Sequence, residues 1–165
     1  METLDAIRLR CSLKTKLTDR EVPTDAVEAV LHAACLAPSA RNTQPWRFVV
    51  VESLGKREEL AALAPQAGMV AAAPVTLAVL LDRGAGYDAL KDVQGIGAAI
   101  ENILLSVHAL GLGACWMGKA RDAAIEAVLG AKEDEELMAL VPIGHPAEQP
   151  GAGSRHSLES ITRFI

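Results

Sequence analysis

The sequence predicts an α+β or α/β fold, in which helices cover one sheet, built as a single domain over residues 1–165. Three observations support this prediction. Half of the 165 residues are hydrophobic, and a domain of about this length hides roughly 70% of its unfolded surface, so the chain can bury a core. Helical patterns come first, and strands and helices then mix around one long apolar helix. The chain is too short for two ordinary domains.

Two helices are predicted before the first strand. Thr3–Arg10 carries apolar residues at helical spacing, which is typical of a short amphipathic helix. Thr24 is the expected N-cap of a second helix, whose apolar positions continue to Cys35 and which ends before Pro38.

The middle of the chain predicts two strands separated by a helix. Trp46–Val51 (WRFVVV) is short and rich in β-forming residues, so it predicts a strand. Ser53–Ala64 predicts a second capped helix. Pro74–Leu81 predicts a buried strand by its length and flanks, although its periodicity alone would also allow a helix.

The longest predicted helix is Asp88–Leu110, which carries a wide apolar stripe and ends at Gly111. Such a helix must be buried on several sides, and another subunit is expected to supply part of that burial. Shorter elements follow without an internal repeat. They are a short strand or extended turn at Gly113–Met117, a helix at Ala120–Leu129 closed by Gly130, a strand at Glu136–Ile143, a loop at His145–Gly153 and a C-terminal segment at Ser157–Ile165.

Composition argues against nucleic acid and membrane as partners. The net charge is −5 and the sequence pI is near 5.4, whereas nucleic-acid binding needs a surplus of cations. Aromatic residues make up only 3% of the chain, too few for a base-stacking platform. The longest apolar run, Met69–Leu81, is about 13 residues long, whereas a membrane span needs roughly 20.

Three cysteines without CxxC spacing predict reduced thiols in a reducing compartment, and no metal site. The first residues, METLDAIRLR, lack the apolar core of a secretory signal, so a cytoplasmic protein is expected. Two GxG patterns, Gly95–Gly97 and Gly111–Gly113, do not join a strand to a helix. They favour helix packing and a helix C-cap over a dinucleotide fingerprint.

Two stretches stand out as candidates for binding. Arg10–Lys14 places two cations and the Ser12 hydroxyl within five residues, which suits phosphate oxygens, although a solvated helix end is the alternative. Ala37–Trp46 places the Asn42 and Gln44 amides in a loop with two prolines. These amides could read a ligand that carries both donors and acceptors, or they could satisfy their own turn.

Together these stretches resemble the FMN-dependent nitroreductase family. The most specific part is the APS-x-x-N-x-QPW pattern at Ala37–Trp46, with R-x-S-x-K at the expected distance upstream. Ala99–Gly118 resembles the family's long dimer-core helix and the GLG turn that follows it. Ile143–Pro146, with the later Ser154–Arg155, resembles the closing strand and the phosphate-binding Arg. The resemblance covers nearly the whole chain, in order.

The resemblance implies a three-layer sandwich with a mixed or antiparallel central sheet flanked by helices, in an intertwined homodimer with two FMN sites at the subunit interface. It also implies three groups of cofactor-binding residues. The group near the phosphate is Arg10, Ser12, Lys14 and Arg155, with Cys11 contributing mainly backbone. The group from the other subunit is Pro38, Ser39, Ala40, Asn42 and Gln44. The group that would line the isoalloxazine is Trp116, Met117 and Gly118, with a backbone N–H near Gly118 as the donor to flavin N5.

The chain departs from the family pattern at several positions. Cys11 stands where a basic residue or His is frequent, Lys16 where Phe is frequent, and Gly153 where a second phosphate cation often lies. The chain also lacks the insertion that covers the flavin in longer members, which predicts a relatively open flavin face.

The resemblance implies an oxidoreductase in which NAD(P)H reduces the flavin and nitroaromatics, quinones or related small molecules then reoxidise it by a ping-pong mechanism. Since the cofactor would perform the chemistry, no catalytic side chain is expected. The alternatives are a flavin storage protein, an electron carrier, or a relative with different flavin chemistry such as a dehydrogenase or dehalogenase. The choices between NADH and NADPH, and between FMN and another flavin, stay open.

Overall fold

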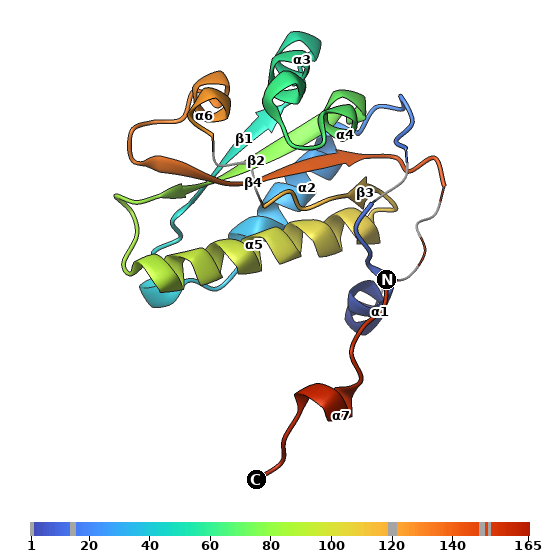
Figure 1. The fold of residues 1–165 in the computed structure, drawn as a ribbon, viewed down its shortest axis with the longest axis vertical. Helices are drawn as coiled ribbons and strands as arrows, with labels where there is room; N and C mark the ends of the chain where they lie inside the picture. The colour runs from blue at the N-terminus through green and yellow to red at the C-terminus, as the bar shows by residue number, and fades with distance from the viewer. Residues whose placement is uncertain (1, 14–15, 119–121, 149–150, 152) are drawn as a thin grey trace.

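The middle layer of the protein is a four-stranded sheet, seen in a computed structural model that describes residues 2–165 apart from 14–15, 119–121, 149–150 and 152 (Figure 1). The strands lie in the order β1-β2-β4-β3. Their bounds are Trp46–Val51 for β1, Val75–Asp82 for β2, Gly113–Ala114 for β3 and Glu135–Gly144 for β4. All three pairings among these strands are antiparallel, so the sheet is antiparallel rather than mixed.

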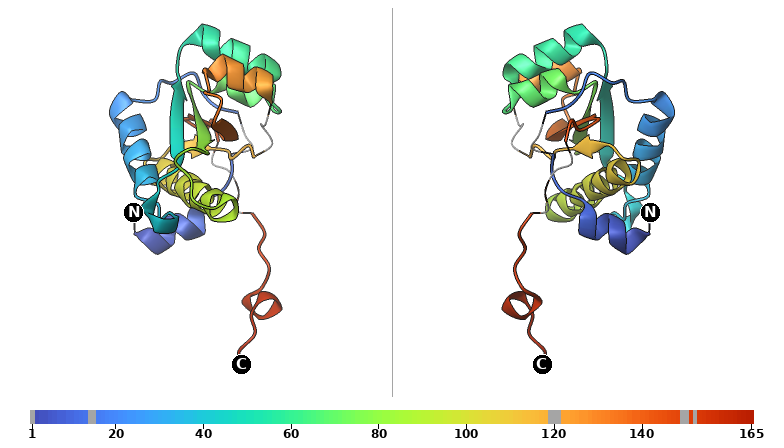
Figure 2. Two further views of the ribbon diagram at one scale, coloured as in Figure 1. Left: turned by 90° about the vertical axis from the view of Figure 1, so that its left-hand side faces the viewer. Right: turned by 90° about the vertical axis from the view of Figure 1, so that its right-hand side faces the viewer.

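Helices cover both faces of the sheet (Figures 1 and 2). On one face, α2 (Thr24–Cys35) packs against α5 (Ala89–Ala109), and both contribute to the larger apolar core. On the other face, α3 (Leu54–Leu63), α4 (Ala67–Ala72) and α6 (Ala123–Leu129) enclose a second core. The architecture is therefore the three-layer α+β sandwich that the resemblance implied.

Strand β2 runs through the centre of this arrangement. Every residue from Val75 to Leu81 is buried, and only Asp82 is partly exposed. Apolar side chains fill both sides of the strand because helices cover both faces of the sheet, so no polar alternation is visible. This confirms the sequence-based prediction of a buried strand.

The structure corrects the N-terminal half in two places. Pro23, with φ −61° and ψ 142°, is the N-cap of α2, and Thr24 is already helical without a side-chain capping bond. Helix α4 was not predicted at all. Its sequence, AGMVAA, is too short and uniform to show a helical period, and it merges into the apolar run that leads to β2.

Helix α5 has the predicted boundaries and a well-defined start. The Asp88 side chain accepts the Lys91 N–H at 3.1 Å, which caps the first turn. At the other end Gly111 has φ 75°, a conformation that glycine adopts without a steric penalty. Gly95 and Gly97 both lie within this helix, so their GxG pattern serves helix packing as expected.

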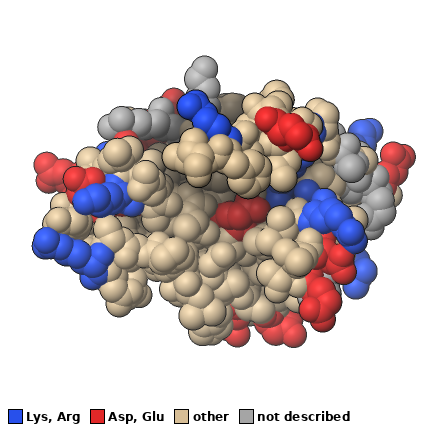
Figure 3. All heavy atoms as spheres, turned by 90° about the horizontal axis from the view of Figure 1, so that it is seen from below, with Lys and Arg blue, Asp and Glu red and all other residues tan. Residues whose placement is uncertain are grey.

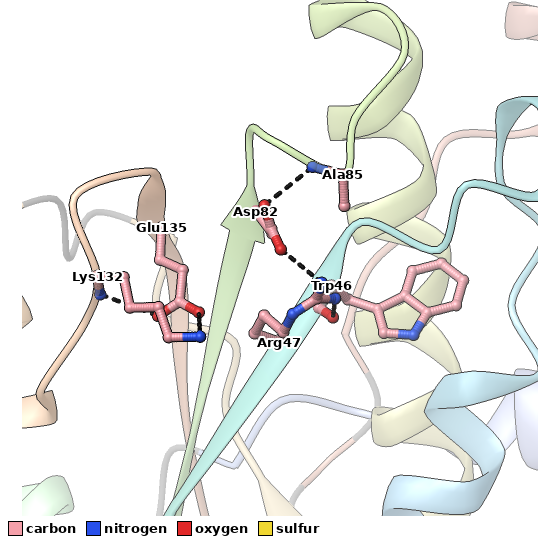
Figure 4. Close-up of polar contacts among 6 residues, drawn as sticks. All are labelled: Trp46, Arg47, Asp82, Ala85, Lys132 and Glu135. Atoms are coloured by element: carbon pink, nitrogen blue, oxygen red, sulfur yellow. Dashed lines mark hydrogen bonds and ion pairs between the residues drawn. The ribbon is translucent and has the colours of Figure 1, made fainter.

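A short turn joins β2 to α5 and is tied to β1. The Asp82 carboxylate accepts the Ala85 N–H at 3.0 Å and forms an ion pair with Arg47 (Figure 4). The neighbouring Trp46 indole points away from this contact and belongs to the larger core. The start of β1, the end of β2 and the turn that leads to α5 are thereby tied together.

The C-terminal part differs from the compact body. Helix α6 ends at Gly130, with φ 68°, as predicted, while its predicted first residue, Ala120, lies outside the described residues. The described residues between 151 and 165 are all exposed, and they project from the body as a tail that carries α7 (Leu158–Ile161) (Figures 1 and 2).

Within the described ranges, no helix is long and apolar enough to cross a membrane. No group of three or more His, Cys, Asp or Glu side chains in that part of the chain could hold a metal ion. Cys11, Cys35 and Cys115 all lie in described segments and form no disulfide.

Candidate functional site

The segment that follows α1 (Thr3–Leu9) runs beside the sheet edge and along α5. Leu13 is fully buried, and its N–H donates to the Ala114 carbonyl of β3 at 2.8 Å. The Arg10 side chain is only 16% exposed, and its Nε lies 3.3 Å from Oε1 of Glu101 on α5. The Arg10 guanidinium is therefore held against the helix rather than extended into solvent.

The other members of this segment differ in exposure. Ser12 is exposed and Cys11 is half-buried. Lys14, the second predicted phosphate cation, lies outside the described residues. The described part of the segment thus presents one guanidinium and one hydroxyl, both hydrogen-bond donors suited to anionic oxygens.

The turn after β3 also packs on α5. The Trp116 side chain is 42% exposed, and a Cβ added to Gly97 would lie 3.9 Å from its Cη2 atom. Gly118 is exposed, whereas Met117 is 4% exposed with its side chain in the second core. The Met117 N–H donates to the Leu140 carbonyl at 2.9 Å, and its own carbonyl accepts the Leu140 N–H at 3.2 Å. Trp116 and Gly118 are therefore exposed on either side of the buried Met117, which is hydrogen-bonded to β4.

Helix geometry brings one member of the first predicted group, Arg10, and one member of the third, Trp116, to the same side of α5. Positions 97 and 101 are one turn apart on α5, within roughly 40° of each other around the helix axis. Trp116 meets the helix at Gly97 and Arg10 meets it at Glu101. One side of α5 therefore carries an exposed indole next to a guanidinium.

The second predicted group, the loop at residues 38–44, packs on the other side of α5. A Cβ at Gly95 would lie 3.5 Å from the Pro38 carbonyl oxygen and from Ser39 Cβ. Seven residues further on, Asn102 Nδ2 donates to the Ala33 carbonyl of α2 at 2.9 Å, so this side of α5 faces α2. Positions 95 and 97 are roughly 200° apart around the helix. Within one chain, the loop and the Arg10–Trp116 pair thus attach to opposite sides of α5.

The loop itself has an unusual backbone. Arg41, Asn42 and Gln44 have φ values of 53°, 57° and 50°. These values lie in the left-handed region, which residues other than glycine and asparagine rarely adopt. Each such residue costs about 1–3 kcal/mol unless the surroundings hold it. Here the Gln44 N–H donates to Ser39 Oγ at 3.0 Å, and the Asn42 N–H donates to the Ser39 carbonyl at 3.0 Å. The loop is therefore fixed before any ligand binds.

The side chains of this loop are available in different degrees. Pro38, Asn42 and Gln44 are exposed, while Ser39 and Ala40 are half-buried. Gln44 Nε2 donates to the Asn42 carbonyl at 3.4 Å, so the Gln44 amide does support its own turn, the alternative left open by the sequence. Arg155, the last predicted anchor, lies exposed on the tail, where its Nη1 donates to the Ser154 carbonyl at 2.8 Å.

Sequence reasoning missed two contributors near these groups. Glu101, the partner of Arg10, interrupts the apolar pattern of α5, and that interruption was a usable signal. Arg41 lies at an unspecified position of the loop pattern, and its guanidinium carbon lies 3.9 Å from the centroid of the Tyr87 ring. Nothing in the sequence pattern links Arg41 to Tyr87, because the contact depends on the loop conformation.

Comparisons with known proteins identify the family of this chain. The family model of the nitroreductase family matches residues 7–67 and 63–145. The chain is 37% identical over 155 residues to a Methanothermobacter thermautotrophicus protein named as an NADH dehydrogenase/NAD(P)H nitroreductase, covering 92% of this chain and 81% of the relative. It is 33% identical over 153 residues to an Archaeoglobus fulgidus protein of the same name, covering 90% and 87%.

A solved structure is also very similar. The crystal structure of a Desulfovibrio desulfuricans protein, described as a nitroreductase in complex with FMN, superposes with a TM-score of 0.92 at 36% identity. The superposition covers 100% of this chain and 97% of the other. On the family match, the identities and the shared fold, this chain belongs to the nitroreductase family.

Proposed function

We propose that this protein is an FMN-dependent oxidoreductase that takes electrons from NAD(P)H and passes them to nitroaromatics, quinones or related small acceptors. The observation that carries the proposal is the convergence of Arg10 and Trp116 on one side of α5, at Glu101 and Gly97. The Desulfovibrio relative, which shares the fold over its whole length, was solved with FMN bound.

The donors present fit a flat cofactor that ends in a phosphate. Arg10 lies against Glu101 with its Nε 3.3 Å from Oε1, and its guanidinium is a planar fork that suits phosphate oxygens. Ser12 adds an exposed hydroxyl two residues away. The partly exposed Trp116 indole offers an apolar surface for a flat ring, and the neighbouring Gly118 is exposed.

In this proposal the protein binds and orients, and bound FMN supplies hydride and electron transfer. Arg10, Ser12, Lys14 and Arg155 hold the phosphate and the nearby flavin edge. A backbone N–H near Gly118 would serve as the donor to flavin N5, and Lys14, which lies outside the described residues, would supply a positive charge to the flavin. No side chain of this set is required as a general acid, base or nucleophile.

The opposite placement of the loop implies a site shared between two chains. Pro38, Ser39, Ala40, Asn42 and Gln44 serve the flavin of the partner subunit, in an intertwined homodimer. Figure 3 shows a broad area without charged side chains on the lower face, bordered near the middle by acidic and basic side chains. Such exposed apolar area is typical of protein interfaces. Large exposed apolar side chains occur on α1, on the first turns of α5 and on the tail, and they are Leu4, Ile7, Leu90, Val93, Leu158, Ile161 and Phe164.

A steady-state turnover assay distinguishes a reductase from a flavin storage protein or an electron carrier. Purified protein with FMN is mixed with NADH or NADPH and a quinone or nitroaromatic acceptor, and coenzyme oxidation is followed. A reductase oxidises many equivalents of coenzyme per flavin. Oxidation that stops at one equivalent per flavin would instead support a carrier.

Tryptophan fluorescence reports the proposed position of the flavin. FMN binding is expected to quench Trp116, whose side chain is 42% exposed beside the site, more than Trp46, which is 5% exposed in the core. In an FMN titration, Trp116→Phe should remove most of the quenching, while the matched variant Trp46→Phe should retain it. Equal quenching in both variants would place the flavin elsewhere.

A further inference from the structure

Two cations surround a single aromatic ring next to the strained loop. The Arg41 guanidinium carbon lies 3.9 Å from the centroid of the Tyr87 ring, and Lys91 Nζ lies 5.2 Å from the same centroid. Tyr87 is 43% exposed, and Arg41 and Lys91 are both exposed. Arg41 comes from the loop, whereas Tyr87 and Lys91 come from the β2–α5 turn and the first turn of α5.

Among the residues that the structure describes, no carboxylate forms an ion pair with either cation. Two carboxylates at the start of α5, Asp88 and Asp92, accept hydrogen bonds from backbone groups. Asp92, only 5% exposed, accepts the N–H groups of Tyr87 and Asp88, and the Asp88 side chain accepts the Lys91 N–H. Arg41 and Lys91 thus both lie against the Tyr87 ring, and neither is bound in an ion pair within the described residues.

The surrounding structure fixes this arrangement. Arg41 is held in a left-handed conformation, with φ 53°, by the hydrogen bonds that close the loop around Ser39. Tyr87 is held through the turn that Asp82 ties to Arg47 (Figure 4). Holding two cations over one ring is useful for recognition because the donors are preorganised and lose little freedom on binding.

We propose that Arg41, Lys91 and Tyr87 form a phosphate-binding patch for the nicotinamide coenzyme, at the mouth of the flavin site to which the loop contributes. This proposal rests on the proposed function. The proposed reductase binds two ligands at the flavin face, the nicotinamide coenzyme and the electron acceptor. Only the coenzyme necessarily carries phosphates. Arg41 lies between Ala40 and Asn42, two residues expected to face the flavin, so a coenzyme that reaches the flavin passes close to its side chain. The guanidinium fork matches phosphate oxygens, and the Lys91 ammonium adds a second positive charge.

Calorimetric binding of NAD⁺ and NADP⁺ to the FMN-loaded protein tests this patch, because both carry the phosphates but cannot reduce the flavin. Arg41→Gln is expected to raise the Kd about fivefold and Lys91→Gln about twofold at low salt, with weaker effects at high salt. Arg41→Lys should retain part of the affinity. Lys56→Ala removes one positive charge on α3, on the opposite face of the sheet from α5, and should leave both Kd values unchanged.

The two coenzymes distinguish the phosphates. A loss confined to NADP⁺ assigns the patch to the 2′-phosphate, and an equal loss for both assigns it to the pyrophosphate. Unchanged Kd values for both coenzymes in the double variant Arg41→Gln/Lys91→Gln overturn the proposal. An Arg41 variant could lose FMN because Arg41 lies in the loop. In that case Lys91→Gln, whose substitution lies on α5, is the deciding variant. Unchanged coenzyme Kd values in Lys91→Gln would then count against the patch.

This readout is independent of the proposed reductase activity. If wild-type flavin is not reduced by either coenzyme while the variants still weaken NADP⁺ binding, the patch stands and the electron-donor assignment fails. If the flavin is reduced normally and no variant changes either the Kd or the coenzyme KM, the patch fails and the reductase assignment stands.

Discussion

Replacing Arg10 by Ala is expected to weaken FMN binding by about 1.5–3 kcal/mol, the range for a hydrogen bond to a charged group, which corresponds to roughly 10- to 150-fold in Kd. The effect is large because the Arg10 side chain is only 16% exposed and is already oriented by Glu101. Its loss removes a preorganised phosphate ligand. Titration of apoprotein with FMN, followed by Trp116 fluorescence, measures the change.

Arg8→Ala is the matched control for this variant. Arg8 lies on the same helix end, but its side chain is 73% exposed and pairs with Asp5 at 2.6 Å. Its removal should leave the FMN Kd within about twofold of wild type, since exposed ion pairs contribute little. If Arg10→Ala and Arg8→Ala bind FMN equally well, Arg10 does not hold the phosphate.

Mixed dimers of Arg10→Ala and Asn42→Ala chains are expected to recover one intact flavin site. In the shared-site proposal, each site takes Arg10 from one chain and Asn42 from the other. In the mixed dimer, one flavin site then contains both substitutions and the other site contains neither. In a homodimer of either single variant, both flavin sites contain a substitution. Differently tagged chains can be co-purified and titrated with FMN, and the number of tight sites per dimer is the readout.

The structural reason for this expectation is the division of α5 into two sides. Pro38 and Ser39 contact the helix at Gly95, and Trp116 contacts it at Gly97, roughly 200° around the axis. If both groups served the same site within one chain, every mixed dimer would carry two damaged sites. A mixed dimer without any tight FMN site would therefore disprove the shared arrangement.

Most elements could be predicted because their signals are local. The β-rich stretch Trp46–Val51 is bounded as β1 in the structure, and the wide apolar stripe with its terminal glycine located α5. Asp88 and Gly130 act as the expected boundary residues because capping depends on a few neighbouring atoms. Helix α4 escaped prediction because its alanine-rich sequence has no polar face to define a period.

The motifs of the candidate site could be located in the sequence, but their arrangement in space could not. The motifs at Arg10–Lys14 and Ala37–Trp46 are visible in the sequence, but the pairing of Arg10 with Glu101 depends on how the chain packs along α5. The left-handed backbone at Arg41 and Gln44 is likewise imposed by the loop's hydrogen bonds, since neither residue type favours it. Long-range packing, which no local pattern encodes, decides both features.

Anaerobic reduction of the bound flavin tests the central proposal most directly. Protein loaded with FMN is mixed with NADH or NADPH without oxygen, and the flavin absorption band is followed before and after addition of a quinone or nitroaromatic. We expect at least one coenzyme to bleach the band and the acceptor to restore it. A flavin that dithionite reduces but that stays oxidised with both coenzymes would contradict the assignment of this protein as an NAD(P)H oxidoreductase.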